Sequence, residues 1–296
     1  MLDLYLALSV MDEKEAVSAD SGEHYQKSLD AFTRAVEQCL ATSTQTMGLN
    51  VSADVGSRIS EGQRRYWASI LFTRLCTSSI SILLLCPESK INPYGAHWDL
   101  ASVATLTRSL FESSLMFVYL AIENVPEDEW LTRLRVMQLH DCTSRVDMFR
   151  DLGWNAERLK GFEEQASELR NRISGNSFFS ALPRSVQKKL LGGHQASMLT
   201  QDEIIKRTGK TSSFIWGYYK FLSSQVHPLP LGFYRMGGQN RGRGVENDVD
   251  RDHIAGALAL AAEILSDCNR DMQKSFAGLV TFSPGRVDWS GLFKTK

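Results

Sequence analysis

The chain has 296 residues, of which 43% are hydrophobic and 23% are charged. This length is enough to bury a large core, and the two fractions are ordinary for a globular protein, so a chain that is disordered or coiled-coil throughout is excluded. The formal net charge is −1. This charge does not support a nucleic-acid partner, because such proteins usually carry a basic excess or stripe, although a local basic patch stays open.

The five cysteines are odd in number and far apart, which predicts neither a disulfide framework nor a CxxC metal site. We therefore expect free thiols, a reducing compartment and a cytoplasmic location. The segment Met1–Met11 is apolar but short and lacks a basic region, so we do not interpret it as a signal peptide. The longest apolar stretch, 66–86, contains Arg74 and several Ser and Thr residues, which favours a buried helix and no membrane partner.

Apolar residues recur every three or four positions along most of the chain, the period of amphipathic helices. The helix at about 97–123 is apolar on most sides, which is typical of the interior of a bundle. Pro126 occupies the favoured first turn of the next helix, and Pro228 ends a later one. In chain order, helices are expected at about 22–47, 57–85, 97–123, 126–151, 155–173, 185–191, 201–207, 212–226 and 247–273.

These elements predict an all-α fold, a multi-helix bundle around the central apolar helix at about 97–123 with short peripheral helices. No internal repeat or long linker is visible, so residues 1–296 are expected to form a single helical domain. Its core would comprise about 22–153 and 211–273, and a peripheral helical insertion would comprise about 154–210.

Arg108 and Glu112 lie four residues apart on the central helix and therefore share one face. Removing one partner of a buried ion pair costs on the order of 3–5 kcal/mol, so both charges would need partners from neighbouring helices. Two interpretations stay open at this point. The pair either belongs to a buried network that fixes helix register, or it lines a functional polar pocket.

His227 directly precedes Pro228, which pushes it out of the helical region and places it at or just past a helix C-terminus. The negative end of the helix dipole favours the imidazolium form there, and histidine titrates near neutral pH. Ser223 lies four residues earlier, but the orienting acid and oxyanion hole of a Ser–His catalytic pair are not visible. Helix capping or a core hydrogen bond is the alternative role.

Two short patches of sequence carry a family resemblance. The first is Arg108-Ser109-Leu110-Phe111-Glu112, with Tyr119 further along the same helix, and the second is Tyr219-x-x-Leu222-Ser223-x-x-Val226-His227-Pro228. Together they resemble an uncharacterised bacterial all-α family, domain of unknown function 5677, over about residues 60–235. The resemblance implies a helical fold and a bacterial origin without an established activity, and it makes Tyr119, Tyr219 and Ser223 binding candidates.

The resemblance invites comparison with helical nucleases of the HEPN type, some of which act in toxin and phage-defence systems. Their hallmark is an arginine four to six residues from a histidine near a helix end. The residues before His227 supply Lys220 but no arginine at that spacing. The spacing does occur at Arg135 and His140, in the middle of the expected helix 126–151, where a chance match is the simpler interpretation.

Neither a metal nor another cofactor is predicted. Asp250 and His253 have a helical i, i+3 spacing, but a di-iron bundle typically presents Glu-x-x-His on two helices, and the chain contains no such motif. The glycine-rich loop 229–246 carries Arg235, Arg241 and Arg243. This loop could bind phosphate, cover a pocket or serve as a solvated connection, so Arg241 and Arg243 are further binding candidates.

We expect an interior polar cluster of Arg108, Glu112, Tyr219 and His227, closed on one side by the loop 229–246. The preferred function is a binding or interaction module in bacterial stress or phage defence, with a protein partner or a homo-oligomer left open. The alternative is a metal-independent ribonuclease with Arg108, Glu112 and His227 as catalytic candidates. In that enzyme His227 acts as general acid or base and Arg108 stabilises charge, which requires the two to converge.

Overall fold

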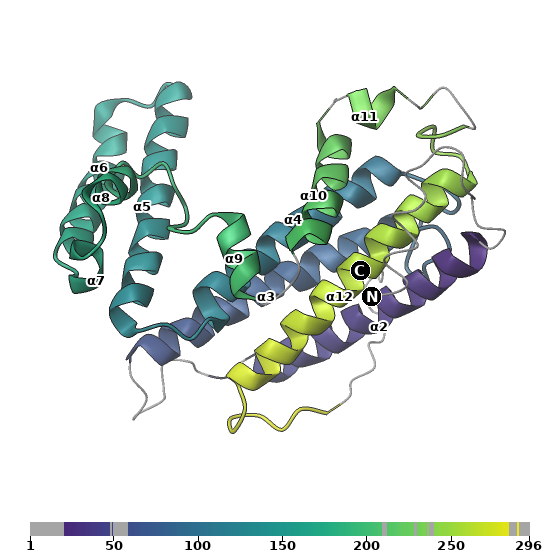
Figure 1. The fold of residues 1–296 in the computed structure, drawn as a ribbon, viewed down its shortest axis with the longest axis horizontal. Coiled ribbons are helices and arrows are strands. Elements are labelled where there is room, and N and C mark those ends of the chain that lie inside the picture. Colours follow the sequence, from purple (N-terminus) through teal and green to yellow (C-terminus); the bar gives the residue numbers. More distant parts are fainter. Residues whose placement is uncertain are drawn as a thin grey trace. The chain divides into compact units, whose positions relative to one another are not determined.

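The computed structural model describes residues 21–47, 49, 59–208, 212–227, 230–234, 236, 240–283 and 289. Within these residues the regular elements are helices, and the only β-pairings are two isolated bridges, Trp98 with Gly244 and Ala277 with Val280. The predicted all-α, multi-helix bundle is therefore confirmed (Figure 1). The helices are α2 (Ser21–Thr46), α3 (Ile59–Leu85), α4 (Leu100–Phe117), α5 (Glu127–Asp151), α6 (Ala156–Ser174), α7 (Ser177–Ser180), α8 (Arg184–Leu191), α9 (Gln201–Arg207), α10 (Ser212–Val226), α11 (Pro230–Phe233) and α12 (Asp248–Ser275), with a π-helical segment η1 (Val118–Ile122).

The central helix differs from its expected form at both ends. It begins at Leu100 because the carboxylate of Asp99 accepts a hydrogen bond from the backbone N–H of Ser102 at 3.0 Å, an N-cap interaction. Its last turn, Val118–Ile122, is a π-helix, a form that sequence periodicity does not distinguish from an α-helix. The short helices α7 and α11 were not predicted, since four residues are too few to display a helical period.

The chain divides into two compact units. The first comprises residues 1–51, 65–122 and 211–296, and the second comprises 52–64 and 123–210. The second unit is larger than the insertion expected at 154–210, because it also contains α5, which is part of the expected core. The single helical domain over 1–296 stays a prediction.

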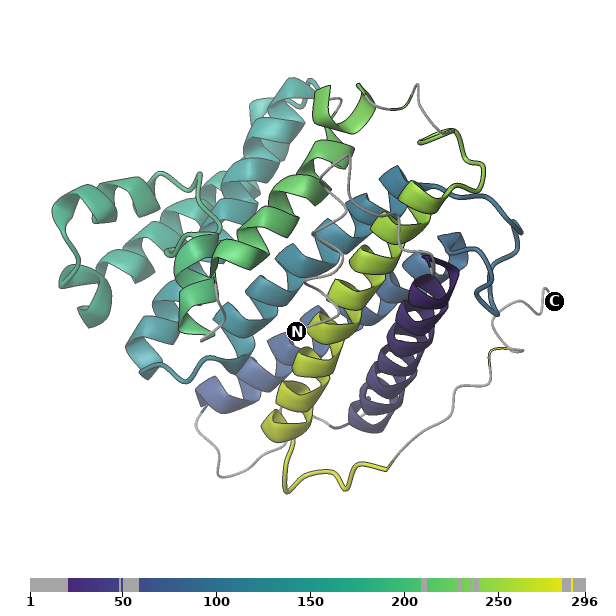
Figure 2. The same ribbon diagram turned by 45° about the vertical axis from the view of Figure 1, so that its right-hand side comes forward.

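The first unit is built around α4, which packs against α10 and α12. Its buried side chains include Val103, Leu110 and Phe117, and the ring of Phe117 lies 5.9 Å from that of Phe72 on α3. Helix α12 runs along α2 in the same direction (Figure 2). The hydroxyl of Ser21 donates to Asp248 at the start of both helices, and Gln273 donates to Thr42 near their ends.

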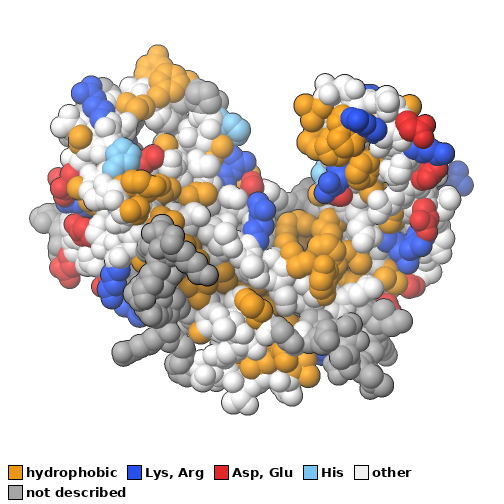
Figure 3. Space-filling model, turned by 180° about the vertical axis from the view of Figure 1, so that it is seen from behind, with side chains coloured by type: hydrophobic (Ala, Val, Ile, Leu, Met, Phe, Trp, Pro, Cys, Tyr) orange, Lys and Arg blue, Asp and Glu red, His pale blue; other side chains and the backbone are white. Residues whose placement is uncertain are grey.

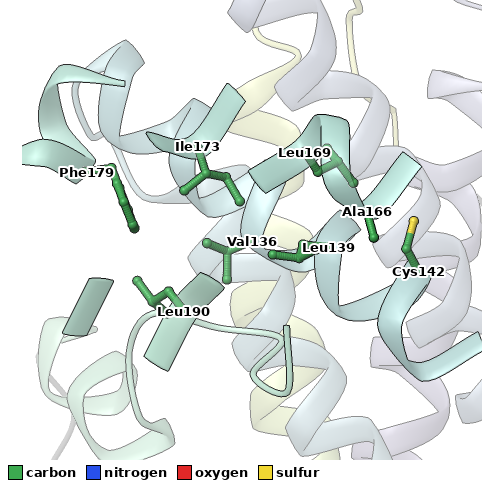
Figure 4. Close-up of a cluster of buried hydrophobic side chains, with 8 residues drawn as sticks. All are labelled: Val136, Leu139, Cys142, Ala166, Leu169, Ile173, Phe179 and Leu190. Atoms are coloured by element: carbon green, nitrogen blue, oxygen red, sulfur yellow. The ribbon is translucent and has the colours of Figure 1, made fainter. Parts of the chain in front are cut away.

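The second unit has its own hydrophobic core between α5 and α6, closed by the short helices that follow (Figure 4). Helix α6 is rich in charged residues, but it contributes one apolar face to this core. This unit therefore buries hydrophobic side chains of its own. The core residues are Val136, Leu139, Cys142, Ala166, Leu169, Ile173, Phe179 and Leu190.

A fully buried arginine lies in the second unit near the start of α5. Arg133 forms ion pairs with Glu123 at 2.6 Å and with Glu129 at 2.5 Å, and its side chain has no exposed surface. Arg207 on α9 pairs with Glu123 at 2.7 Å. Arg64 at the start of α3 donates to the backbone carbonyl of Glu123 and stacks over Trp130. These contacts join α3, α5 and α9 through charge.

All five cysteines are free, as expected, and all five are buried. Among the described residues, one helical segment, Glu61–Leu85, is long and apolar enough to cross a membrane by composition alone. Its most apolar window has a mean hydropathy of 1.7 and is 39% buried within the protein. The segment Met1–Met11 lies outside the described residues, and so does Arg235 in the loop 229–246.

Candidate functional site

The candidate site lies where α4 packs against α10 in the first unit (Figure 1). Arg108 and Glu112 are one turn apart on α4, and Tyr219 lies on α10. The rings of Phe111 and Tyr219 are 6.0 Å apart and hold the two helices at this point. His227 directly follows the last residue of α10, where the sequence analysis placed it.

These four side chains meet in one cluster, as predicted. Arg108 Nη2 donates to the hydroxyl of Tyr219 at 3.1 Å, and that hydroxyl donates to Glu112 Oε1 at 2.9 Å. Arg108 Nη2 also forms an ion pair with Glu112 Oε1 at 3.2 Å. Arg108 Nη1 lies 3.4 Å from His227 Nε2. The arginine therefore contacts the other three members of the cluster.

The prediction that this cluster lies in the interior is wrong. The side chain of Arg108 is 19% exposed and that of Glu112 is 37% exposed, while His227 is exposed. Because α10 ends at Val226, His227 lies at the border of the helix pair and not between the helices. The apolar residues of the central helix correctly predicted that the helix is buried. They could not predict which of its turns lies beside the end of a neighbouring helix.

The charge of Arg108 is stabilised by its neighbours. Partial burial disfavours the charge, but hydrogen bonding to Tyr219 and the carboxylate of Glu112 outweigh burial and raise the pKa of the guanidinium. A guanidinium has only donors. Its contact with His227 is therefore a hydrogen bond only when Nε2 of the imidazole carries no proton and can accept.

The backbone at the end of α10 explains the positions of Ser223 and His227. The backbone N–H of His227 donates to the carbonyl of Ser223 at 3.2 Å, which closes the last helical turn. The hydroxyl of Ser223 donates to the carbonyl of Tyr219 at 2.6 Å. Since this hydroxyl is occupied within its own helix, the geometry does not support a Ser–His nucleophilic pair.

The other binding candidates lie outside the cluster. Tyr119 belongs to η1 and is fully buried in the core of the first unit. Arg241 and Arg243 occupy the turn before α12, and among the described residues neither arginine forms a hydrogen bond or an ion pair with the cluster. Closure of the cluster by the loop 229–246 stays a prediction, since part of that loop lies outside the described residues.

The spacing of Arg135 and His140 does not form a site. Arg135 donates to the carbonyl of Arg172 near the end of α6, at 3.0 Å. The Nδ1 atom of His140 instead lies 3.0 Å from the carbonyl oxygen of Gly193. The two side chains thus contact different segments of the second unit, and a chance match remains the simplest interpretation.

Asp250 has a structural role that explains its position beside His253. It accepts hydrogen bonds from the backbone N–H of Gly242 at 2.6 Å and from the amide of Asn247 at 2.8 Å, which anchors the turn before α12. Across the part of the chain that the structure describes, no three histidine, cysteine or acidic side chains form a group that could hold a metal ion.

A family model gives the chain its place among known proteins. A model described as a family of unknown function, DUF5677, matches residues 65–244. The chain belongs to this family. No curated protein and no solved structure matches the chain. The DUF5677 match contains α4, α10 and all four residues of the cluster, together with Arg241 and Arg243, whereas α2 and α12 lie outside it.

Proposed function

We propose that this DUF5677 protein is a helical binding module whose cluster of Arg108, Glu112, Tyr219 and His227 binds a phosphate group of its ligand. The observation that carries the proposal is the 3.4 Å approach of the Arg108 guanidinium to the exposed His227 imidazole. Guanidinium and imidazole groups are preferred donors to phosphate oxygens, and charge-assisted hydrogen bonds of this kind are stronger than neutral ones.

The remaining two side chains position the arginine. The Tyr219 hydroxyl and the Glu112 carboxylate both contact Nη2, which orients the other edge of the guanidinium, with Nη1, toward His227. Glu112 also balances the charge of Arg108 when no ligand is bound. A phosphate that accepts from Nη1 would therefore meet a donor that is already oriented, at low cost in side-chain entropy, and the imidazole would donate to it through Nε2 when that nitrogen carries a proton.

Calorimetric titration with inorganic phosphate and with pyrophosphate tests this proposal. We expect Arg108→Gln to weaken binding roughly tenfold to a hundredfold, because hydrogen bonds to charged groups contribute about 1.5–3 kcal/mol. Arg74→Gln is the matched control, since Arg74 is an exposed arginine on α3 of the same unit and should leave affinity unchanged. Equal affinities for the wild type and both variants would contradict the proposal.

A second function, metal-independent ribonuclease activity, is favoured by the same convergence of Arg108 and His227. His227 would exchange a proton with the attacking or leaving oxygen, and Arg108 would stabilise charge on the phosphate. Pooled RNA incubated with pure protein and a chelator provides the test. We expect cleavage by the wild type and none by His227→Ala, and equal cleavage by both proteins would remove His227 from any mechanism.

We place this module, as part of the same proposal, in the cytoplasm of a bacterium, in a stress or phage-defence system. The support is the family resemblance together with five free, buried thiols, which suit a reducing compartment. The genes that neighbour this one provide the check. Neighbours that encode nucleases, antitoxins or other phage-defence proteins are the expected result.

A further inference from the structure

An exposed aromatic pair lies at the end of α11, close along the chain to the proposed phosphate site: Phe233 is the last residue of the helix and Tyr234 follows it. The side chain of Tyr234 is 78% exposed and that of Phe233 is 48% exposed, and their ring centroids are 5.9 Å apart. Hydrophobic side chains reach the surface over α11 in the space-filling view (Figure 3). Single exposed aromatic residues are common, but two adjacent ones with their rings side by side form a platform.

Close packing at Gly232 holds this platform against the end of α10. A Cβ atom at Gly232 would lie 2.4 Å from the carbonyl oxygen of Ser224, so the α11 backbone contacts the last turn of α10 directly. Ser224 is three residues before His227. The aromatic pair is therefore fixed beside the helix end that carries the site, although α10 and α11 are joined by residues 228–229, outside the described part of the chain.

A second contact joins the arginine turn 241–243 to Met236, in the segment that follows the platform. Gly242 has a φ of +63°, and a Cβ atom there would lie 2.8 Å from the terminal methyl of Met236, two residues after Tyr234. The hydrogen bond from Gly242 N–H to Asp250 anchors the turn to the start of α12. Just beyond it, the backbone N–H of Trp98 donates to the carbonyl of Gly244 at 3.1 Å.

The charge of this surface favours an anionic ligand. Within the described residues neither Arg241 nor Arg243 forms an ion pair, and Arg243 is exposed. The nearby acids are occupied elsewhere, because Glu246 and Asp248 pair with Arg251, and Asp250 accepts hydrogen bonds from the turn itself. The surface thus combines the exposed guanidinium of Arg243 and the half-buried one of Arg241 with aromatic faces.

From these contacts we infer that the ligand is a single-stranded polynucleotide. One phosphate occupies the Arg108–His227 site, a neighbouring base stacks on the Phe233–Tyr234 platform, and Arg241 and Arg243 contact further phosphates. Single strands fit better than duplexes, since a duplex hides its base faces by stacking them on one another, whereas unstacked bases pair readily with aromatic side chains. This inference rests on the proposed function and names its ligand class.

Fluorescence anisotropy with a labelled oligouridylate tests the inference. Stacking on one aromatic residue is worth about tenfold or more in affinity, so we expect Tyr234→Ala to weaken binding by at least about tenfold. Tyr66→Ala is the matched control, because Tyr66 is 53% exposed on α3 of the same unit and lies outside the platform. Arg243→Gln should weaken binding and reduce its dependence on salt concentration, as expected when one phosphate contact is lost.

The outcomes separate this inference from the proposed function. If inorganic phosphate binds in an Arg108-dependent way but the oligouridylate binds equally to Tyr234→Ala and Tyr66→Ala, the polynucleotide ligand is refuted and the phosphate site stands. Self-association that depends on Tyr234, measured by sedimentation, together with no binding of the oligouridylate, would also refute the polynucleotide ligand. Because Tyr234 is largely exposed, the variant should fold, and a thermal melt that matches the wild type verifies this.

Discussion

Replacing Arg133 with alanine should lower the free energy of unfolding of the second unit by about 3–5 kcal/mol. The guanidinium is fully buried, and the two carboxylates that it pairs with, Glu123 and Glu129, are 20% and 15% exposed. Burial disfavours the charge of Glu123, but hydrogen bonds from Arg133 and Arg207 outweigh burial and lower its pKa. Without Arg133 these largely buried carboxylates would lack most of the positive charge that pairs with them. A buried charge without a partner destabilises the folded state.

Urea unfolding followed by circular dichroism measures this loss, and Arg145→Ala provides a matched control. Arg145 also lies on α5 and pairs with an acid four residues earlier, Asp141, but both side chains are largely exposed. The control should unfold like the wild type, because exposed ion pairs contribute little. If Arg133→Ala proves too unstable to purify, Glu129→Gln replaces it. A loss no larger than that of the control would show that the network does not stabilise the fold.

Acidification should destabilise the first unit through His253. This histidine is buried and its ring lies 4.7 Å from that of Phe221. Burial, helped by the positive charge of Arg241 and opposed by Asp250 and Asp252, lowers the pKa of His253 from 6.5 to about 4. Between these two values the unfolded chain binds a proton that the folded chain does not. The free energy of unfolding is therefore highest above pH 6.5 and decreases by on the order of 3 kcal/mol as the pH falls toward 4.

The comparison of wild type with His253→Phe isolates this effect. Phenylalanine keeps the aromatic contact with Phe221 and cannot bind a proton. Between pH 6.5 and pH 4 the free energy of unfolding of the variant should therefore fall by about 3 kcal/mol less than that of the wild type. Parallel curves for wild type and His253→Phe, from urea unfolding at each pH, would rule out a buried neutral His253.

Local signals in the sequence were sufficient to predict most helices. Thr200 and Glu203 form a capping box at the start of α9, and Asn155 caps α6, so these helices begin where the sequence predicts. Pro126 stands at the N-cap of α5. Both partners of such a capping interaction lie within about one helical turn of each other, so the interaction can be predicted from the sequence alone.

Contacts between distant segments were predicted only in part. The convergence of Arg108 with His227 followed from the two family patches, but the exposure of the cluster depends on where α10 ends against α4. Arg133, a fully buried charge among the described residues, was missed altogether. Its one sequence signal is Glu129 four residues earlier, which is indistinguishable from an exposed pair such as Asp141 and Arg145.

The aromatic platform and the π-helical segment were also missed, for related reasons. Phe233 and Tyr234 follow closely after two prolines in a glycine-rich loop, and adjacent aromatic residues there could have indicated an exposed contact surface. Whether the loop folds onto α10 depends on the fit of Gly232 against Ser224, which no periodicity encodes. The change from α- to π-helix at Val118 likewise has no period of its own.

The most direct test of the account is whether phosphate contacts His227 with the help of Arg108. Nuclear magnetic resonance of histidine-labelled protein follows the imidazole signals during a titration with inorganic phosphate at constant pH. We expect the His227 signals to shift and saturate in the wild type and to stay unchanged in Arg108→Gln. The signals of His140 should stay unchanged in both proteins. If the signals of His227 and His140 respond alike, or those of His227 respond equally with and without Arg108, the cluster is not a phosphate site.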